Sequence, residues 1–128
     1  MITGERILSI SGKREKREPI QGLNINIGIE KINVNGEDIE IEYLYTANYE
    51  KDVGQLQIRG VLMAKEDKKL AKEIEDEWKK NKKMPENYMT TVLSAINYSG
   101  SANGTLLARV LGLTAPFIPP RIQIAKKE

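Results

Sequence analysis

The side chains that most often carry covalent or metal chemistry are missing from this chain, which has 0 Cys and 0 His in 128 residues. Without a thiol or an imidazole, disulfides, thiolate nucleophiles, Cys/His zinc sites and imidazole-dependent triads are excluded. Carboxylates are plentiful, but Glu40 and Glu42 lie on the solvent face of a predicted strand and are explained by solubility. The sequence therefore predicts a protein that is not an enzyme and that has no cofactor and no metal site.

Phosphate binding has three candidate stretches. "SGSANGTLLA" (99–108) is glycine-poor and lacks the lysine and the preceding strand of a phosphate-binding loop. "KREKR" (13–17) and "KKNKK" (79–83) are basic, but the net charge is only +2, and lysines near a helix C-terminus are favoured by the helix dipole. Nucleic-acid binding through these lysine-rich patches therefore remains a minor alternative.

Length and hydropathy indicate one domain over residues 1–128 with enough chain to bury a core. The opening "MITGERILSI" lacks the apolar core of a signal peptide, and no apolar run reaches the roughly 18 residues that span a bilayer. We expect a soluble, cytoplasmic protein.

Alternating apolar and polar residues dominate "LNINIGIEKINVNGEDIEIEYLYTANY" (23–49), which is the period of a strand with one buried face. The apolar positions are Leu23, Ile25, Ile27 and Ile29, then Ile39, Ile41, Tyr43, Tyr45 and Ala47. Asn35-Gly36 lies between the two runs and predicts a type I′ turn centred on these residues, with Val34 opposite Glu37. The segment is thus a predicted β-hairpin.

The apolar phase changes from odd to even positions between Ile29 and Ile32. An uninterrupted ladder would turn Ile29 towards the polar face, because a slip of one residue exchanges the two faces of a strand. One extra residue at 30–31, a β-bulge, would restore Ile29 opposite Ile41. We therefore predict a bulge there.

Two more strands flank the hairpin. "GQLQIRGVLMAKE" (54–66) places alternate apolar residues on one face, and "RILSISGKREKREP" (6–19) is a strand with Leu8 and Ile10 directed inward. The charges of the latter alternate in sign, which is typical of a protected edge strand. The prediction is a four-stranded antiparallel sheet.

The second half has helical periodicity. In "EDKKLAKEIEDEWKKNKK" (66–83), Leu70, Ile74 and Trp78 recur every four residues, and Trp78 is the expected docking anchor. Pro85 suits the first turn of a second helix. That helix has two interpretations near 99–103: a kink or break, favoured because a glycine costs about 1 kcal/mol inside a helix, or a continuous helix.

Small residues recur at four-residue spacing along the second helix, at Gly100, Gly104, Ala108 and Gly112. Such a stripe lets another backbone approach closely, so Gly100, Gly104 and Ala108 are candidate subunit contacts. The tail from 114 to 128 contains "PFIPP", which cannot be helical throughout. The predicted class is α+β: strands within about 5–64, then two helices, or three if the second breaks, within 66–113 on one face of the sheet.

This order of elements resembles the SecB-type export chaperones and their archaeal and toxin-linked relatives. The likeness is carried by the early strand with its proline, the hairpin, "GQLQIRGVLMAKE" and "LLARVLGLTAPFIPPRI" (106–122), and it spans most of the chain. The resemblance implies a homo-oligomer, a dimer or a tetramer, that holds unfolded or extended polypeptides without a nucleotide. The chain is slightly basic, whereas bacterial members are acidic, which argues against coupling to the export motor.

If the resemblance holds, apolar positions beside the sheet and the long helix receive client segments, and Leu44, Leu113, Phe117 and Ile118 are the candidates. An apolar groove binds many sequences weakly, and several sites together raise avidity. A structural or adaptor domain whose apolar tail completes its own core is an equally favoured interpretation.

Overall fold

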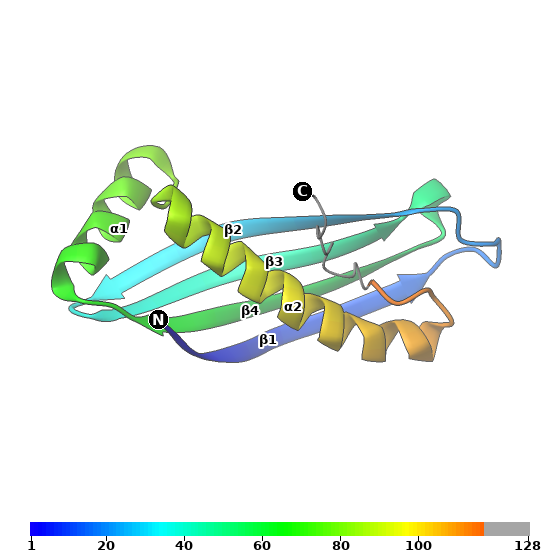
Figure 1. Ribbon diagram of the computed structural model, residues 1–128. Coiled ribbons are helices and arrows are strands. Elements are labelled where there is room, and N and C mark those ends of the chain that lie inside the picture. The colour runs from blue at the N-terminus through cyan, green and yellow to red at the C-terminus, as the bar shows by residue number, and fades with distance from the viewer. Residues whose placement is uncertain (117–128) are drawn as a thin grey trace, which may run out of the picture.

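The computed structural model describes residues 1–116 as a four-stranded antiparallel sheet with both helices on one face (Figure 1). The strands are β1 (Ile2–Arg14), β2 (Leu23–Asn35), β3 (Asp38–Tyr49) and β4 (Gly54–Lys65), in the order β1-β4-β3-β2. They are followed by α1 (Lys68–Asn81) and α2 (Glu86–Leu111). The predicted α+β class is confirmed, and the part of the tail beyond residue 116 lies outside the described residues.

The turn of the β2–β3 hairpin is displaced by one residue from the predicted position. Asn35 pairs with Asp38, so Gly36 and Glu37 form the two-residue loop. Only Gly36 has a positive φ, 67°, which is typical of a type II′ turn with glycine at its first central position. The predicted type I′ turn is therefore wrong, because one glycine suffices here and Asn35 stays in the strand.

The predicted β-bulge is confirmed in β2. The ladder shifts between Ile29 and Lys31, which leaves Glu30 as the extra residue. Ile29 pairs with Tyr43 instead of the predicted Ile41, because the displaced turn moves the register by two. A shift of two residues keeps every side chain on its face, so the apolar face was assigned correctly.

The core lies between the inner face of β3 and β4 and the two helices. Its members on these strands are Ile39, Ile41, Tyr43, Tyr45, Ala47, Tyr49, Leu56, Ile58, Leu62 and Ala64, all at most 3% exposed. Leu8 and Ile10, which were predicted to point inward, are 49% and 47% exposed. Leu8 sits in a register shift of β1, whereas Ile10 lies opposite Ile58 and so on the inner face, as predicted, but on an edge strand.

Helix α1 begins at an acidic cap and packs through a narrow apolar stripe. The Asp67 carboxylate accepts a hydrogen bond from the Leu70 N–H at 2.8 Å, the expected N-cap geometry. Ile74 is buried, whereas Trp78 is half-buried and has the Lys82 ammonium 5.2 Å from its ring centroid. The docking is therefore carried mainly by Ile74 and its neighbours.

Helix α2 runs without interruption across the sheet (Figure 1). The break that was favoured near 99–103 is absent, although Gly100 and Gly104 lie inside the helix. Both are buried against the sheet side, so packing outweighs their low helix propensity. Within residues 1–116, neither helix is long and apolar enough to cross a membrane.

Candidate functional site

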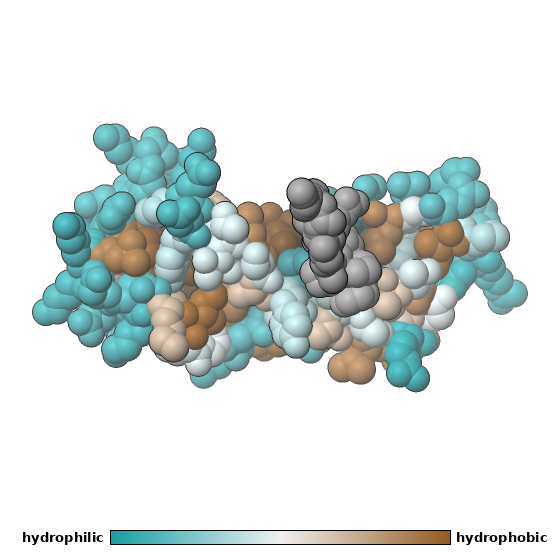
Figure 2. All heavy atoms as spheres, in the orientation of Figure 1, coloured by the Kyte–Doolittle hydropathy of each residue, from teal (hydrophilic) through white to brown (hydrophobic). Residues whose placement is uncertain are grey.

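The inner face of β2 carries an apolar strip that the helices leave incompletely covered. Its residues are all half-buried, in contrast to the fully buried inner faces of β3 and β4. They are Leu23, Ile25, Ile27, Ile29, Ile32 and Val34, and are called the β2 strip below. Figure 2 shows brown, apolar surface on this face where β2 runs in Figure 1. An accessible strip of this kind can bury apolar side chains of another polypeptide.

A polar cluster fixes α2 over the sheet. The Glu5 carboxylate, on the inner face of β1, accepts hydrogen bonds from the Tyr43 hydroxyl and from Ser99 Oγ at 2.5 Å. Burial, followed by the hydrogen bond and the charge of Glu5, raises the pKa of Tyr43. Tyr43 is therefore a neutral donor at physiological pH, and this cluster joins β1, β3 and α2.

The residues that follow α2 form a second feature of this face, a strap defined here as residues 112–116. Three side chains donate hydrogen bonds to its carbonyls. Arg14 Nη1 lies 2.5 Å from the Gly112 oxygen, the Tyr49 hydroxyl donates to the Thr114 oxygen, and the Tyr45 hydroxyl lies 3.4 Å from the Pro116 oxygen. The strap begins at Gly112, the left-handed C-cap of α2, and β1 and β3 supply the three donors.

Two glycines make room for the strap's apolar side chains. Leu113, 7% exposed, lies against Gly54, where a Cβ would be 3.1 Å from its Cδ1. Pro116 is fully buried against Gly104, where a Cβ would be 2.7 Å from the proline Cγ. The two side chains therefore fill a cradle that exists because both supporting residues lack a side chain.

The hydroxyl groups that hold the strap are neutral donors. Burial, followed by the nearby Tyr45, raises the pKa of Tyr49 to about 12. Burial likewise raises the pKa of Tyr45. Ser101 is 6% exposed, and among the described residues its hydroxyl has no hydrogen-bond partner. The site can therefore hydrogen-bond peptide carbonyls through neutral hydroxyls at Thr114 and Pro116 and through the Arg14 guanidinium at Gly112.

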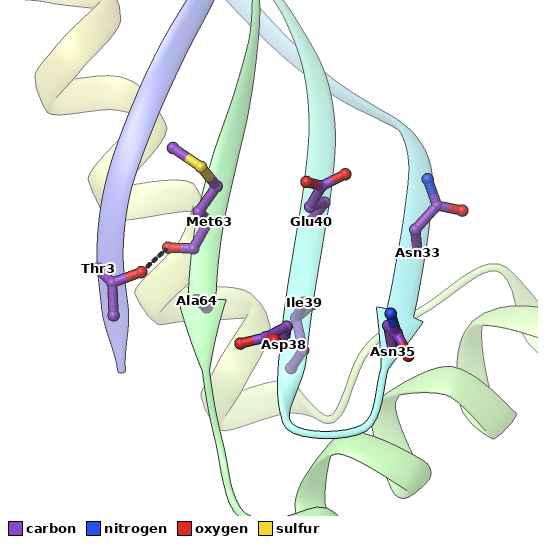
Figure 3. Close-up of a pocket in the computed structure, with 8 residues that line it drawn as sticks. All are labelled: Thr3, Asn33, Asn35, Asp38, Ile39, Glu40, Met63 and Ala64. Carbon is purple, nitrogen blue, oxygen red and sulfur yellow. Dashed lines mark hydrogen bonds between the residues drawn. The ribbon is translucent and has the colours of Figure 1, made fainter.

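The outer face of the sheet is polar and carries a shallow pocket of about 560 Å³ (Figure 3). Thr3, Asn33, Glu40 and Met63 line it from all four strands, and the Thr3 hydroxyl donates to the Met63 carbonyl at 3.2 Å. Asp38 is exposed and pairs with Lys65 at 3.3 Å. Polar groups that are exposed to solvent in this way lack the buried surroundings of a typical functional site, so this pocket is a weaker candidate site than the inner face. No cluster of metal-ligating side chains occurs in the described part of the chain.

Comparison with solved structures connects this geometry to a known architecture. The chain is similar to Mycobacterium tuberculosis Rv1957, a SecB-like chaperone solved in complex with a ChAD peptide from the HigA1 antitoxin (Rv1956). The TM-score is 0.59 at 14% sequence identity, over 88% of this chain and 83% of that one. The chain has a SecB-like fold. No protein-family model matches the sequence, and no curated protein matches it.

Within this SecB-like fold, the predicted peptide-binding residues do not come together. Leu113 is on the inner face, whereas Leu44 is half-buried on the outer face opposite Arg59. Phe117 and Ile118 lie outside the described residues. The role of these four positions stays a prediction.

The small-residue stripe of α2 is occupied within the chain itself. A Cβ at Gly100 would lie 2.3 Å from the Tyr45 ring, and Gly104 receives Pro116. Ala108 is 0% exposed. The close approach that these residues allow is therefore to the chain's own sheet and strap, and a subunit contact through Gly100, Gly104 and Ala108 remains untested.

Sequence reasoning missed the residues that hold the strap. A signal existed in β3, where Tyr43, Tyr45 and Tyr49 share the buried face, because a buried tyrosine hydroxyl normally finds a partner. That rule predicts polar acceptors above the sheet but does not say which. The acceptors proved to be Glu5 and the strap, which lie 38 or more residues away in the sequence.

Proposed function

We propose that the protein is a non-enzymatic, oligomeric, polypeptide-binding protein that holds extended or unfolded chains on the inner face of its sheet. The observation that carries the proposal is the β2 strip, six apolar side chains left half-buried beside a completely buried core. Monomeric proteins seldom leave a contiguous apolar surface without a binding role. The SecB-like fold supports the proposal, since Rv1957 was solved with a peptide.

Binding on this face follows from apolar burial and hydrogen bonding to the backbone. An extended client presents alternate side chains to one side, which matches the two-residue period of the β2 strip. Burial of apolar area contributes about 25 cal/mol per Å², so a few half-covered side chains give weak binding to many sequences. Several such sites in one oligomer raise the overall affinity.

The oligomer is proposed to form through the outward face of α2. Its apolar residues recur every four positions and are strongly exposed: Tyr98 at 80%, Leu106 at 66% and Val110 at 82%, with exposed Ala102 between them. This outer stripe, Tyr98, Ala102, Leu106 and Val110, is a single line of apolar surface that a second copy can cover. Figure 2 shows apolar surface along the lower edge of the C-terminal half of α2.

An adaptor domain is the second candidate. It is favoured by Leu113 and Pro116, which are buried in their own chain and so complete a core. Nucleic-acid binding has less support, because Lys79 pairs with Glu75 at 3.6 Å and the Lys82 ammonium is over Trp78. A cytoplasmic location remains a prediction.

Suppression of aggregation of an unfolded test protein separates these functions. The wild type is expected to suppress aggregation without a nucleotide, and an adaptor domain is not. Two changes on the β2 strip, Ile25→Gln with Ile27→Gln, should weaken client binding about thirtyfold, because each removes roughly 1 kcal/mol of apolar burial. The matched control is Leu44→Gln on the outer face, which should leave binding unchanged.

The control also decides between the two faces. A larger effect of Leu44→Gln would move the client site to the outer face and contradict the proposal. Thermal unfolding of each variant verifies that the comparison is made on folded protein. Absence of suppression by the wild type, together with a solution mass of one chain, would exclude a holdase.

A further inference from the structure

We propose that the strap occupies a binding site for client segments, and that a client enters this site by displacing the strap. This inference rests on the proposed function and adds the class of segment that the site accepts. That class is an extended chain with an apolar residue followed three positions later by proline, as Leu113 is followed by Pro116.

The hydrogen bonds of the strap involve its backbone alone. Tyr49 and Tyr45 donate to the carbonyls of Thr114 and Pro116, which are two residues apart. Any extended chain presents carbonyls at this spacing, whatever its side chains. The same two hydroxyls can therefore hold a client backbone in place of the strap.

Selectivity comes from the cradle that receives the strap's side chains. Gly54 and Gly104 leave space for one aliphatic side chain and one compact ring, and the occupants are Leu113 and Pro116. Proline has no N–H group, so it can be buried at this point without leaving a donor unsatisfied. A charged or long polar residue at either position would lose its hydration without a partner.

The Pro116 end of the strap is its most weakly held part. The hydrogen bond from the Tyr45 hydroxyl to the Pro116 carbonyl is 3.4 Å long, beyond the usual range for a hydroxyl donor, whereas Arg14 and Tyr49 bind the Gly112 and Thr114 carbonyls more closely. The buried Ser101 hydroxyl has no hydrogen-bond partner among the described residues. A buried hydroxyl without a partner is costly, so a chain that seats better at this end can displace the strap.

Changing the strap alone tests the exchange and leaves the cradle intact. In the full chain, Leu113→Ser with Pro116→Ser removes the two side chains that fill the cradle and keeps Gly54, Gly104, Tyr45 and Tyr49. The matched control is Thr114→Ser, an exposed residue of the same strap. Thermal unfolding of each variant verifies that the comparison is made on folded protein.

The probe is a fluorescent peptide with the sequence of residues 110–118, VLGLTAPFI. We expect the Leu113→Ser, Pro116→Ser variant to bind it at least tenfold more tightly than the wild type, because the strap no longer competes for the cradle, and Thr114→Ser to bind it as the wild type does. The peptide carrying L113S and P116S should bind the wild type at least tenfold more weakly than the unchanged peptide. Both results together support the site.

Three outcomes would overturn the inference. Equal binding of the unchanged and the L113S, P116S peptides by the wild type would contradict the cradle as the source of selectivity. Equal peptide binding by the wild type and by the folded Leu113→Ser, Pro116→Ser variant, while both suppress aggregation, would show that clients bind elsewhere and leave the proposed function intact. Absence of suppression by the wild type and by the variant would remove the proposed function, and this site with it.

Discussion

Replacing Gly100 by alanine tests the closest approach between α2 and the sheet. Two effects oppose each other in this variant. Alanine is favoured over glycine inside a helix by about 1 kcal/mol. The new Cβ, however, would lie 2.3 Å from Tyr45 Cδ2, about 1 Å inside the ordinary contact limit of 3.4 Å.

The packing effect should outweigh the helix propensity. Tyr45 is 0% exposed, so its ring has no free space into which it can move. Overpacking a dense core costs about 1–3 kcal/mol, and a contact this short belongs in the upper part of that range. We therefore expect Gly100→Ala to lower the free energy of unfolding by about 1–2 kcal/mol.

A control six residues earlier in the helix isolates the propensity effect. Ser94 is exposed on α2 and is not part of the outer stripe, so Ser94→Gly should be less stable than Ser94→Ala by the propensity difference alone, about 1 kcal/mol. Adding that measured difference to the loss in Gly100→Ala gives the cost of displacing Tyr45 or lifting the helix. Positions 94 and 100 lie in the same helix but differ in burial.

Urea denaturation followed by circular dichroism measures all the variants at one fixed protein concentration, because oligomer formation makes apparent stability concentration-dependent. If Gly100→Ala raises stability by the amount that separates Ser94→Ala from Ser94→Gly, no clash exists. That result would mean that α2 does not lie on Tyr45, and the description of the inner face would be wrong.

The remaining predictions address the bulge, the buried tyrosines and the outer stripe. Deletion of Glu30 should change the midpoint of unfolding about as little as Glu30→Ala, because it removes only the extra residue and keeps Ile29 opposite Tyr43, whereas deletion of Asn26 in the regular part of the ladder should prevent folding because it turns Leu23 and Ile25 to the polar face; equal losses from the two deletions in circular dichroism melts would contradict the bulge. The pKa of Tyr49 is about 12 when folded and about 10 when unfolded. Its contribution to stability is therefore complete below pH 10 and is lost towards pH 12, at about 1.4 kcal/mol per pH unit, and Tyr49→Phe should flatten this slope in urea titrations. Leu106→Glu should reduce the solution mass measured by light scattering, whereas Arg109→Glu on the same helix should not; an unchanged mass in both would exclude the outer stripe as the subunit contact.

Local sequence patterns were sufficient to predict the strands and helices and the buried faces of β2 and β3. The two-residue period of β2 and β3 identified the buried face, and the phase change after Ile29 located the bulge to within one residue. The sequence did not determine the type and position of the turn, because Asn35 and Gly36 are compatible with more than one two-residue loop. Moving the loop by one residue changed the pairing partners but preserved the faces.

Packing between distant segments determined the continuity of α2 and the exposure of β1 residues, which the periodicity of the sequence does not predict. Helix propensity favoured a break at Gly100 and Gly104, and the helix stays continuous because those residues let it approach Tyr45 and Pro116. The exposure of Leu8 depended on an irregularity in β1, and that of Ile10 on the place of β1 at the edge of the sheet; the alternation of apolar residues in the strand predicts neither.

By itself, the sequence determined the α+β class, the strand faces, the bulge and the lack of thiol or imidazole chemistry, because each depends on residue type or on spacing along the chain. Only the tertiary structure decided that the β2 strip is half-covered and that Tyr45 and Tyr49 hold the strap. The physical reason is that coverage and hydrogen bonding between distant segments depend on how the helices cross the sheet, which no local pattern encodes.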